Sequence, residues 1–139
     1  MTAVITDVKF RMSLSLIRDL RDMGVRVTAC HSGDGRPFAF SSNGIKEAVT
    51  LPDLKADPHG YIEALYKLCA EKAERGDIPA LLPVGAVTLG MLAEPDTHER
   101  FEKVCRMCIP KKESLDLAND KARLGELARK LGVPTPKSY

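Results

Sequence analysis

Two segments of the chain carry polar or charged residues where predicted strands end. The first runs from Thr6 to Ser13 and contains Asp7 and Arg11, a carboxylate and a guanidinium suited to binding a polar substrate. It contains no glycine, so it is not the glycine-rich turn through which a backbone approaches a dinucleotide pyrophosphate. Two interpretations stay open: a substrate-binding loop, or an ordinary strand–helix connection in which Asp7 or Ser13 caps the helix.

The second segment runs from Pro83 to Thr88 and contains Gly85 at a predicted strand-to-helix turn. A glycine there could let a ligand approach the backbone, with Thr88 as a neighbouring polar contact. Gly85 could equally be a simple turn residue. Asp7, Arg11, Gly85 and Thr88 are therefore the predicted substrate-binding residues.

Cys105 and Cys108 have the Cys-x-x-Cys spacing of redox and zinc sites. They fall in a predicted strand over residues 104–109, where side chains three apart point to opposite faces. A redox pair normally opens a helix, and zinc needs two further ligands. We interpret both cysteines as buried or half-buried structural thiols. Because the chain also lacks a Walker A loop and a supported Ser-His-Asp arrangement, it is predicted to contain no catalytic residue and no metal site.

The elements that would position these residues alternate regularly. Apolar, β-branched runs predict strands, and three- and four-residue apolar spacing predicts helices. The order is that of an α/β sandwich with a mostly parallel sheet of about five strands. Ligands bind beyond the carboxyl ends of such strands, where both segments described above lie. Strands are expected at 3–6, 25–30, 46–51, 79–84 and 104–109, a short edge segment at 38–40, and helices at 14–23, 58–76, 87–92, 98–103 and 115–131.

Composition limits the classes of function. A length of 139 residues predicts one domain, and a formal net charge of +2 gives no global basic field for nucleic acid or an anionic membrane. No apolar run approaches the roughly 20 residues of a membrane span, so we expect a cytoplasmic protein with four reduced cysteines. Positive charge gathers from Thr97 onward, with ten Lys and Arg against six Asp and Glu. This excess suits a phosphate-bearing ligand, an acidic partner surface or a solvated helix face.

The C-terminal segment, residues 114–136, resembles the start of the ATP-grasp ligases. It carries an Asp-Lys pair opening a helix, then a Leu/Ala stripe, then Gly-Val-Pro-x-Pro, in the sequence SLDLANDKARLGELARKLGVPTP. Upstream order fits too, with a β-α-β start, Ala48–Pro52 before a long helix, Leu81–Pro83, and a late strand ending in Cys108–Pro110. The whole chain is similar to the pre-ATP-grasp domain of a carbamoyl-phosphate-synthase-like or carboxylate–amine ligase.

This resemblance implies a Rossmann-like three-layer sandwich over residues 1–112, followed by a helix and exit segment over 113–139 leading toward an ATP-grasp domain. In the family, ATP and Mg²⁺ convert a carboxylate into an acyl phosphate, which an amine or ammonia attacks. Lys121 matches the basic residue that can contact nucleotide phosphate in related enzymes. Its alternative is a surface lysine paired with Asp116 or Asp120.

The lid, the adenine-binding segment and the metal-binding acidic residues of the family lie downstream of the part that this chain resembles. The chain is therefore expected to be a substrate-side fragment of a ligase, not catalytic by itself. Its expected partners are an ATP-grasp domain, in the same gene or a separate subunit, and a small carboxylate substrate, with a homodimer possible. The alternative is a stand-alone α/β module that binds a small anionic metabolite.

Overall fold

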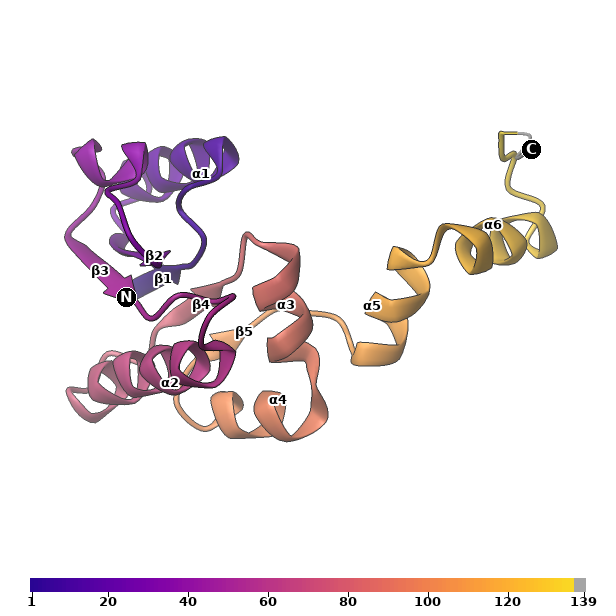
Figure 1. Cartoon of the computed structure of the whole chain (residues 1–139). Helices are drawn as coiled ribbons and strands as arrows, with labels where there is room; N and C mark the ends of the chain where they lie inside the picture. Colours follow the sequence, from indigo (N-terminus) through magenta and orange to yellow (C-terminus); the bar gives the residue numbers. More distant parts are fainter. Residues whose placement is uncertain (137–139) are drawn as a thin grey trace.

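The computed structural model describes residues 1–136, which form a five-stranded sheet, six α-helices and one 3₁₀ helix (Figure 1). In chain order the elements are β1 (Thr2–Ile5), α1 (Arg11–Asp22), β2 (Arg26–Ser32), η1 (Phe38–Ser41), β3 (Glu47–Leu51), α2 (Pro58–Glu74), β4 (Ala80–Leu82), α3 (Ala86–Ala93), α4 (Pro95–Glu102), β5 (Arg106–Met107), α5 (Lys112–Asn119) and α6 (Lys121–Lys130).

The five strands form one sheet in the order β3-β2-β1-β4-β5, and every pairing is parallel. The predicted α/β class and the parallel sheet of about five strands are confirmed. The chain proceeds from β1 outward to β3 and then returns past β1 to form β4. The direction of winding therefore reverses between β1 and β4, and the carboxyl ends of these two strands lie side by side.

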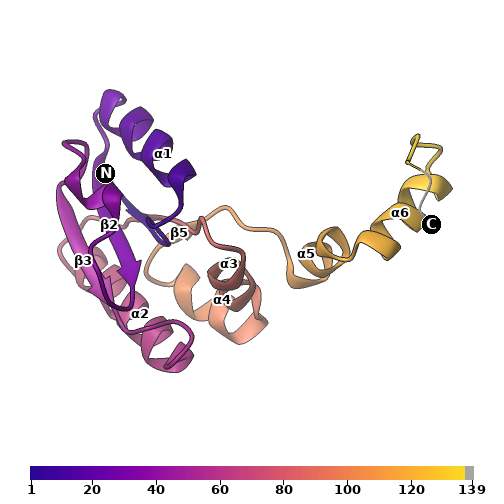
Figure 2. The same cartoon turned by 45° about the horizontal axis from the view of Figure 1, so that its top comes forward.

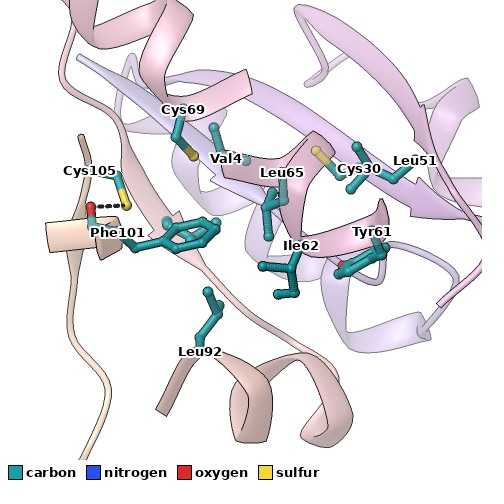
Figure 3. Packing of buried hydrophobic residues seen from close by; sticks show 11 residues of the cluster. Val4, Cys30, Leu51, Tyr61, Ile62, Leu65, Cys69, Leu92, Phe101 and Cys105 are labelled. Carbon is teal, nitrogen blue, oxygen red and sulfur yellow. Dashed lines mark hydrogen bonds between the residues drawn. The ribbon is translucent and has the colours of Figure 1, made fainter. Parts of the chain in front are cut away.

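Both faces of the sheet are covered, because neighbouring residues of a strand point to opposite sides. Ile5 packs toward α1 and η1 with Ile17 and Ala39, whereas Val4 packs toward α2, α3 and α4. This second cluster, drawn in Figure 3, is the larger one. Its fully buried members include Tyr61 and Leu65 from α2, Leu92 from α3 and Phe101 from α4.

Helix α4 is also tied to α2 outside this core. The Arg100 guanidinium donates to both carboxylate oxygens of Glu63 and lies 3.9 Å from the centre of the Tyr66 ring. An ion pair on an aromatic face combines charge-assisted hydrogen bonds with a cation–π contact. The contact fixes how α4 lies along α2.

One predicted element is wrong in type, and another is wrong at its start. The segment expected as an edge strand at 38–40 is the 3₁₀ helix η1, in which the Phe40 N–H donates to the Pro37 carbonyl and Ala39 is buried. Proline pre-sets such a turn with its fixed φ, and these bonds replace strand pairing. The helix expected from residue 98 begins at Pro95, which takes a first helical position where its missing N–H costs nothing.

The single helix expected at 115–131 is two helices, α5 and α6, separated at Asp120. Asp120 has an extended backbone, and its carboxylate accepts the N–H groups of Ala122 and Arg123. Such a cap starts a helix rather than continuing one, so the predicted Asp120–Lys121 helix opening is present. Figures 1 and 2 show α5 and α6 leading away from the sheet.

Candidate functional site

A cavity of about 790 Å³ lies at the carboxyl edge of the sheet, where the winding reverses. Residues at or after the ends of four strands line it: Asp7, Lys9 and Phe10 after β1, Ser32 in β2, Asp53–Lys55 after β3 and Gly85–Val87 after β4. Pro58, the first residue of α2, completes the described lining. This is the crevice in which open parallel sheets bind their ligands.

Asp7 joins the two strands that flank this crevice. It is 3% exposed and has a positive φ of 56°, which is unusual for a residue with a side chain. Its Oδ2 accepts the Thr6 hydroxyl at 2.6 Å and the Gly85 N–H at 3.2 Å. Because Gly85 is the N-cap residue of α3, the Asp7 carboxylate anchors the start of that helix to the end of β1. Neither Asp7 nor Ser13 caps α1, because its N-cap residue is Phe10 and no side chain accepts an N–H group there.

Gly85 has a steric reason to be glycine. A Cβ at this position would lie 2.6 Å from Asp7 Cγ and 2.8 Å from each of its carboxylate oxygens. Atoms this close must move apart, so the close approach of α3 to Asp7 requires the absence of a side chain. The structure therefore brings together two of the four predicted substrate-binding residues, one from each predicted loop.

The other two predicted residues lie outside the described lining of the cavity. Arg11 is exposed at the first position of α1. Thr88 is fully buried within α3, and its hydroxyl lies 3.3 Å from the Tyr61 hydroxyl of α2. Burial raises the pKa of Tyr61, so its phenol stays protonated and can donate this hydrogen bond. Thr88 thus contacts the helix behind the cavity, and the binding roles of all four residues remain predictions.

Two lysines in the cavity were missed by the sequence analysis. Lys9 and Lys55 line it after β1 and β3, and neither forms an ion pair with any residue of 1–136. Asp53 lines the same cavity. Hydrogen bonds from the N–H groups of Ala56 and Lys55 lower the pKa of its carboxyl group, and the positive charges of Lys55 and Lys9 lower it further. The sequence signal that could have identified them is a lysine four residues after the end of each strand, β1 at Ile5 and β3 at Leu51.

Helix α3 adds hydrogen-bond donors to the same cavity. The first N–H groups of an α-helix have no partner within the helix and carry partial positive charge. Gly85 N–H is taken by Asp7, whereas the N–H groups of Ala86 and Val87 donate to no acceptor in the described part of the chain. Cationic side chains and free N–H groups therefore occur together at this edge.

The thiols are arranged differently from the expectation. Strand β5 is only two residues long and separates Cys105 from Cys108. Cys105 is buried and donates its S–H to the Phe101 carbonyl at 3.3 Å, as Figure 3 shows. Cys108 is exposed, so the interpretation of both as buried or half-buried is right for Cys105 and wrong for Cys108. Because β5 ends at Met107, Cys108 lies in the loop that leaves the sheet, where its side chain is not covered.

Within residues 1–136, no group of three or more His, Cys, Asp or Glu side chains is placed to hold a metal ion. None of the helices in this part of the chain is long and apolar enough to cross a membrane. Lys121 is exposed in the first turn of α6. Neither of its suggested ion-pair partners binds it, because Asp116 pairs with Lys112 at 2.6 Å and Asp120 caps the helix.

Two solved structures share this fold. The chain is similar to the biotin carboxylase domain of a single-chain bacterial carboxylase, with a TM-score of 0.59 and 23% identity over 97% of this chain and 30% of that one. It is also similar to the phosphoribosylaminoimidazole carboxylase ATPase subunit from Aquifex aeolicus, with a TM-score of 0.53 and 14% identity over 99% of this chain and 33% of that one. No protein-family model and no curated protein matches the sequence.

The chain therefore spans about a third of the length of these two structures. At these identities the likeness establishes the fold. The predicted resemblance to a pre-ATP-grasp domain is confirmed at that level, including the three-layer arrangement around a parallel sheet.

Proposed function

We propose that this chain is the substrate-side, pre-ATP-grasp domain of an ATP-dependent carboxylate–amine ligase. The main support is the likeness of almost the whole chain to about a third of two larger structures, both from ATP-grasp enzymes. The cavity at the carboxyl edge agrees with this role, because it offers a place for a substrate.

The proposed division follows the chain. Residues 1–112 form the Rossmann-like domain, and residues 113–139 form the helical exit segment toward an ATP-grasp domain, which belongs to the same gene or to a separate subunit. In support, α6 buries none of its residues, and its apolar side chains Leu124, Leu127 and Leu131 are exposed. An exposed leucine stripe is typical of a helix that packs against another domain.

ATP and Mg²⁺ are the cofactors proposed for the complete enzyme, in which they would activate the carboxylate as an acyl phosphate. Among the described residues no group of three or more His, Cys, Asp or Glu side chains is placed to hold a metal ion, and we propose that the nucleotide and metal site lies mainly in the ATP-grasp domain. Lys121 would supply one contact to a nucleotide phosphate, as a compact charge beside the N-terminus of a helix. The chain is accordingly proposed to be inactive alone.

An ADP-release assay on the complete gene product tests this function. ADP should form from Mg-ATP only when a carboxylate and an amine are both supplied. Replacing Lys121 by alanine should raise the KM for ATP about tenfold, the value of one charge-assisted hydrogen bond. The matched control is Lys103→Ala, which removes an exposed lysine paired with Glu99 one turn away. ADP release that needs no carboxylate would contradict the proposal.

A second candidate is a stand-alone α/β module that binds a small anionic metabolite. One observation favours it: the cavity is lined by residues 7–87 alone and needs no second domain. The gene sequence beyond codon 139 distinguishes the two candidates, because a stop there without a neighbouring ATP-grasp gene supports the module. In either case we propose a cytoplasmic protein, in keeping with its four free cysteines, and a homodimer remains a proposal for either form.

A further inference from the structure

Asp7 carries an unusual buried charge. Of all the Asp, Glu, Lys and Arg residues within 1–136 it alone is buried, with 3% exposure. Removing a carboxylate from water is costly unless hydrogen bonds or an opposite charge replace the lost hydration. Asp7 forms no ion pair with any residue of 1–136. Within this part of the chain its charge is therefore balanced only by the hydrogen bonds that it accepts.

These hydrogen bonds reach only one of the two carboxylate oxygens. Asp7 Oδ2 accepts the Thr6 hydroxyl at 2.6 Å and the Gly85 N–H at 3.2 Å. Asp7 Oδ1 accepts from no donor in the described residues 1–136. A carboxylate offers about four acceptor sites, so about half of the capacity of Asp7 is unused.

Asp7 Oδ1 is open to the carboxyl-edge cavity, whose lining includes Asp7. Among residues 1–136, the only fully enclosed polar side-chain atom without a hydrogen-bond partner is His31 Nδ1, so Asp7 Oδ1 is not sealed inside the protein. Glycine at position 85 keeps this oxygen uncovered, because a Cβ there would lie 2.8 Å from it. An unpartnered acceptor on a buried side chain thus faces a space that can hold a ligand.

Other carboxylates of the sheet show what Asp7 lacks. At the opposite edge, Glu47 binds the Lys72 ammonium at 2.5 Å and Asp77 binds the Arg26 guanidinium at 2.6 Å. Both of these carboxylates are more exposed than Asp7 and so lose less hydration. The chain therefore supplies cations to carboxylates that need them less, and the partner of the most buried one has to come from the cavity.

The other charged residues of the cavity do not fill this position. Lys9, Asp53 and Lys55 are all exposed, and water and salt weaken the effect of exposed charges. The Lys9 ammonium lies 5.6 Å from the centre of the Phe10 ring, and the charges of both lysines lower the pKa of Asp53. A cation beside Asp7 Oδ1 would therefore interact mainly with the buried carboxylate.

We propose that the cavity binds a ligand through a primary ammonium group, which donates to Asp7 Oδ1 and supplies the charge that this carboxylate lacks. The carbon skeleton of the ligand lies against Phe10, Leu54 and Val87, of which Phe10 is 41% and Val87 64% exposed. This rests on the proposed function only in calling the ligand a substrate of the ligase. A neutral hydroxyl would fill the acceptor without balancing its charge, and an anion would be repelled by it.

The test is a ¹H–¹⁵N NMR titration of the 139-residue chain with three probes that share a benzyl group: benzylammonium, benzyl alcohol and phenylacetate. Benzylammonium should shift the amide signals of Val8, Gly85 and Ala86 saturably. Benzyl alcohol lacks the charge and phenylacetate has the opposite charge. Because a hydrogen bond between charged groups is the stronger kind, each of these two should bind about tenfold more weakly or worse.

Asp7→Asn separates binding from folding. Both internal hydrogen bonds of Asp7 end on Oδ2, so an asparagine with its carbonyl oxygen in that place keeps them and puts an NH₂ group where Oδ1 was. Asparagine also tolerates the positive φ of 56°. Benzylammonium binding should fall about tenfold or more, while urea unfolding shows the fold kept. Asp19→Asn, which removes an exposed carboxylate from α1, is the matched control and should keep full affinity.

Equal binding of benzyl alcohol and benzylammonium would overturn the inference, as would tighter binding of phenylacetate, no saturable shift with benzylammonium, or full binding by a folded Asp7→Asn. If Asp7→Asn does not fold, the order of the three probes on the original chain decides. The outcome is separable from that of the ADP-release assay. Benzylammonium binding at the cavity without ligase activity in the complete gene product supports the site and refutes the ligase. Ligase activity with no benzylammonium binding does the reverse.

Discussion

The contact between Gly85 and Asp7 predicts a large effect from one methyl group. In Gly85→Ala the added Cβ would lie 2.6 Å from Asp7 Cγ, and that carboxyl is buried and bonded to the Thr6 hydroxyl. It can move away only by losing its hydrogen bonds to Thr6 and the Gly85 N–H. Overpacking and weakened hydrogen bonds to a charged group together cost about 2 kcal/mol. The free energy of unfolding should fall by that amount.

Urea unfolding followed by circular dichroism measures this change. With a slope of about 1.5 kcal/mol per molar urea, the midpoint should fall by roughly 1 M. Gly90→Ala is the matched control in the same helix, where an added Cβ meets no atom within 4 Å, and it should raise stability by up to about 1 kcal/mol. In an Asp7→Gly background, which suits the positive φ at that position, Gly85→Ala should cost much less. Equal midpoints for Gly85→Ala and Gly90→Ala, or an unchanged cost in the Asp7→Gly background, would refute the reasoning.

Three further predictions concern other parts of the chain. The Lys72 ammonium lowers the pKa of Glu47 below its ordinary value near 4.5, so this carboxylate stabilises the fold above that pH and loses its effect as pH falls through the lowered pKa. Glu47→Gln should cost up to about 1 kcal/mol in urea unfolding at pH 7 and progressively less as the pH is lowered below 4.5, and a cost that does not change with pH would contradict the assignment. Cys108 should be the one fast thiol toward a disulfide reagent, since it is exposed while burial raises the pKa of Cys30 to about 12; mass mapping of the label, with Cys108→Ser abolishing the fast phase, checks this. Leu127→Ser on the exposed stripe of α6 should shift the urea midpoint by less than its error, within about 0.5 kcal/mol, and a clear loss of stability would show that α6 is covered by the domain.

Regular features of the sequence predicted the fold well. Short β-branched runs such as Ala3–Thr6 alternate with helical patterns, and this periodicity alone fixes the order of elements and the parallel sheet. Asp7 and Gly85 could be identified as strand-end residues for the same reason. Their direct contact could not, because it joins positions 78 residues apart and depends on which two strands become neighbours.

The errors have local physical causes. The sequence predicted one long helix through Asp120 because leucines recur on both sides of it. In the structure α5 ends at Asn119, and the Asp120 carboxylate caps a new helix. Lys9 and Lys55 were passed over because a surface lysine carries no pattern of its own. They can be recognised as candidate site residues only once the structure shows that the loops after β1 and β3 line one cavity. Cys108 was misplaced because β5 ends at Met107, two residues before the end of the predicted strand at 109.

Calorimetric titration with Mg-ATP tests the central claim most directly, namely that this chain is the substrate-side part of a ligase whose nucleotide site lies elsewhere. The titration is made into the 139-residue chain and, in parallel, into the complete gene product. The complete product should bind Mg-ATP with a dissociation constant in the micromolar range, whereas the chain should show none tighter than about 1 mM. Micromolar binding by the chain alone, or none by the complete product, would contradict the account.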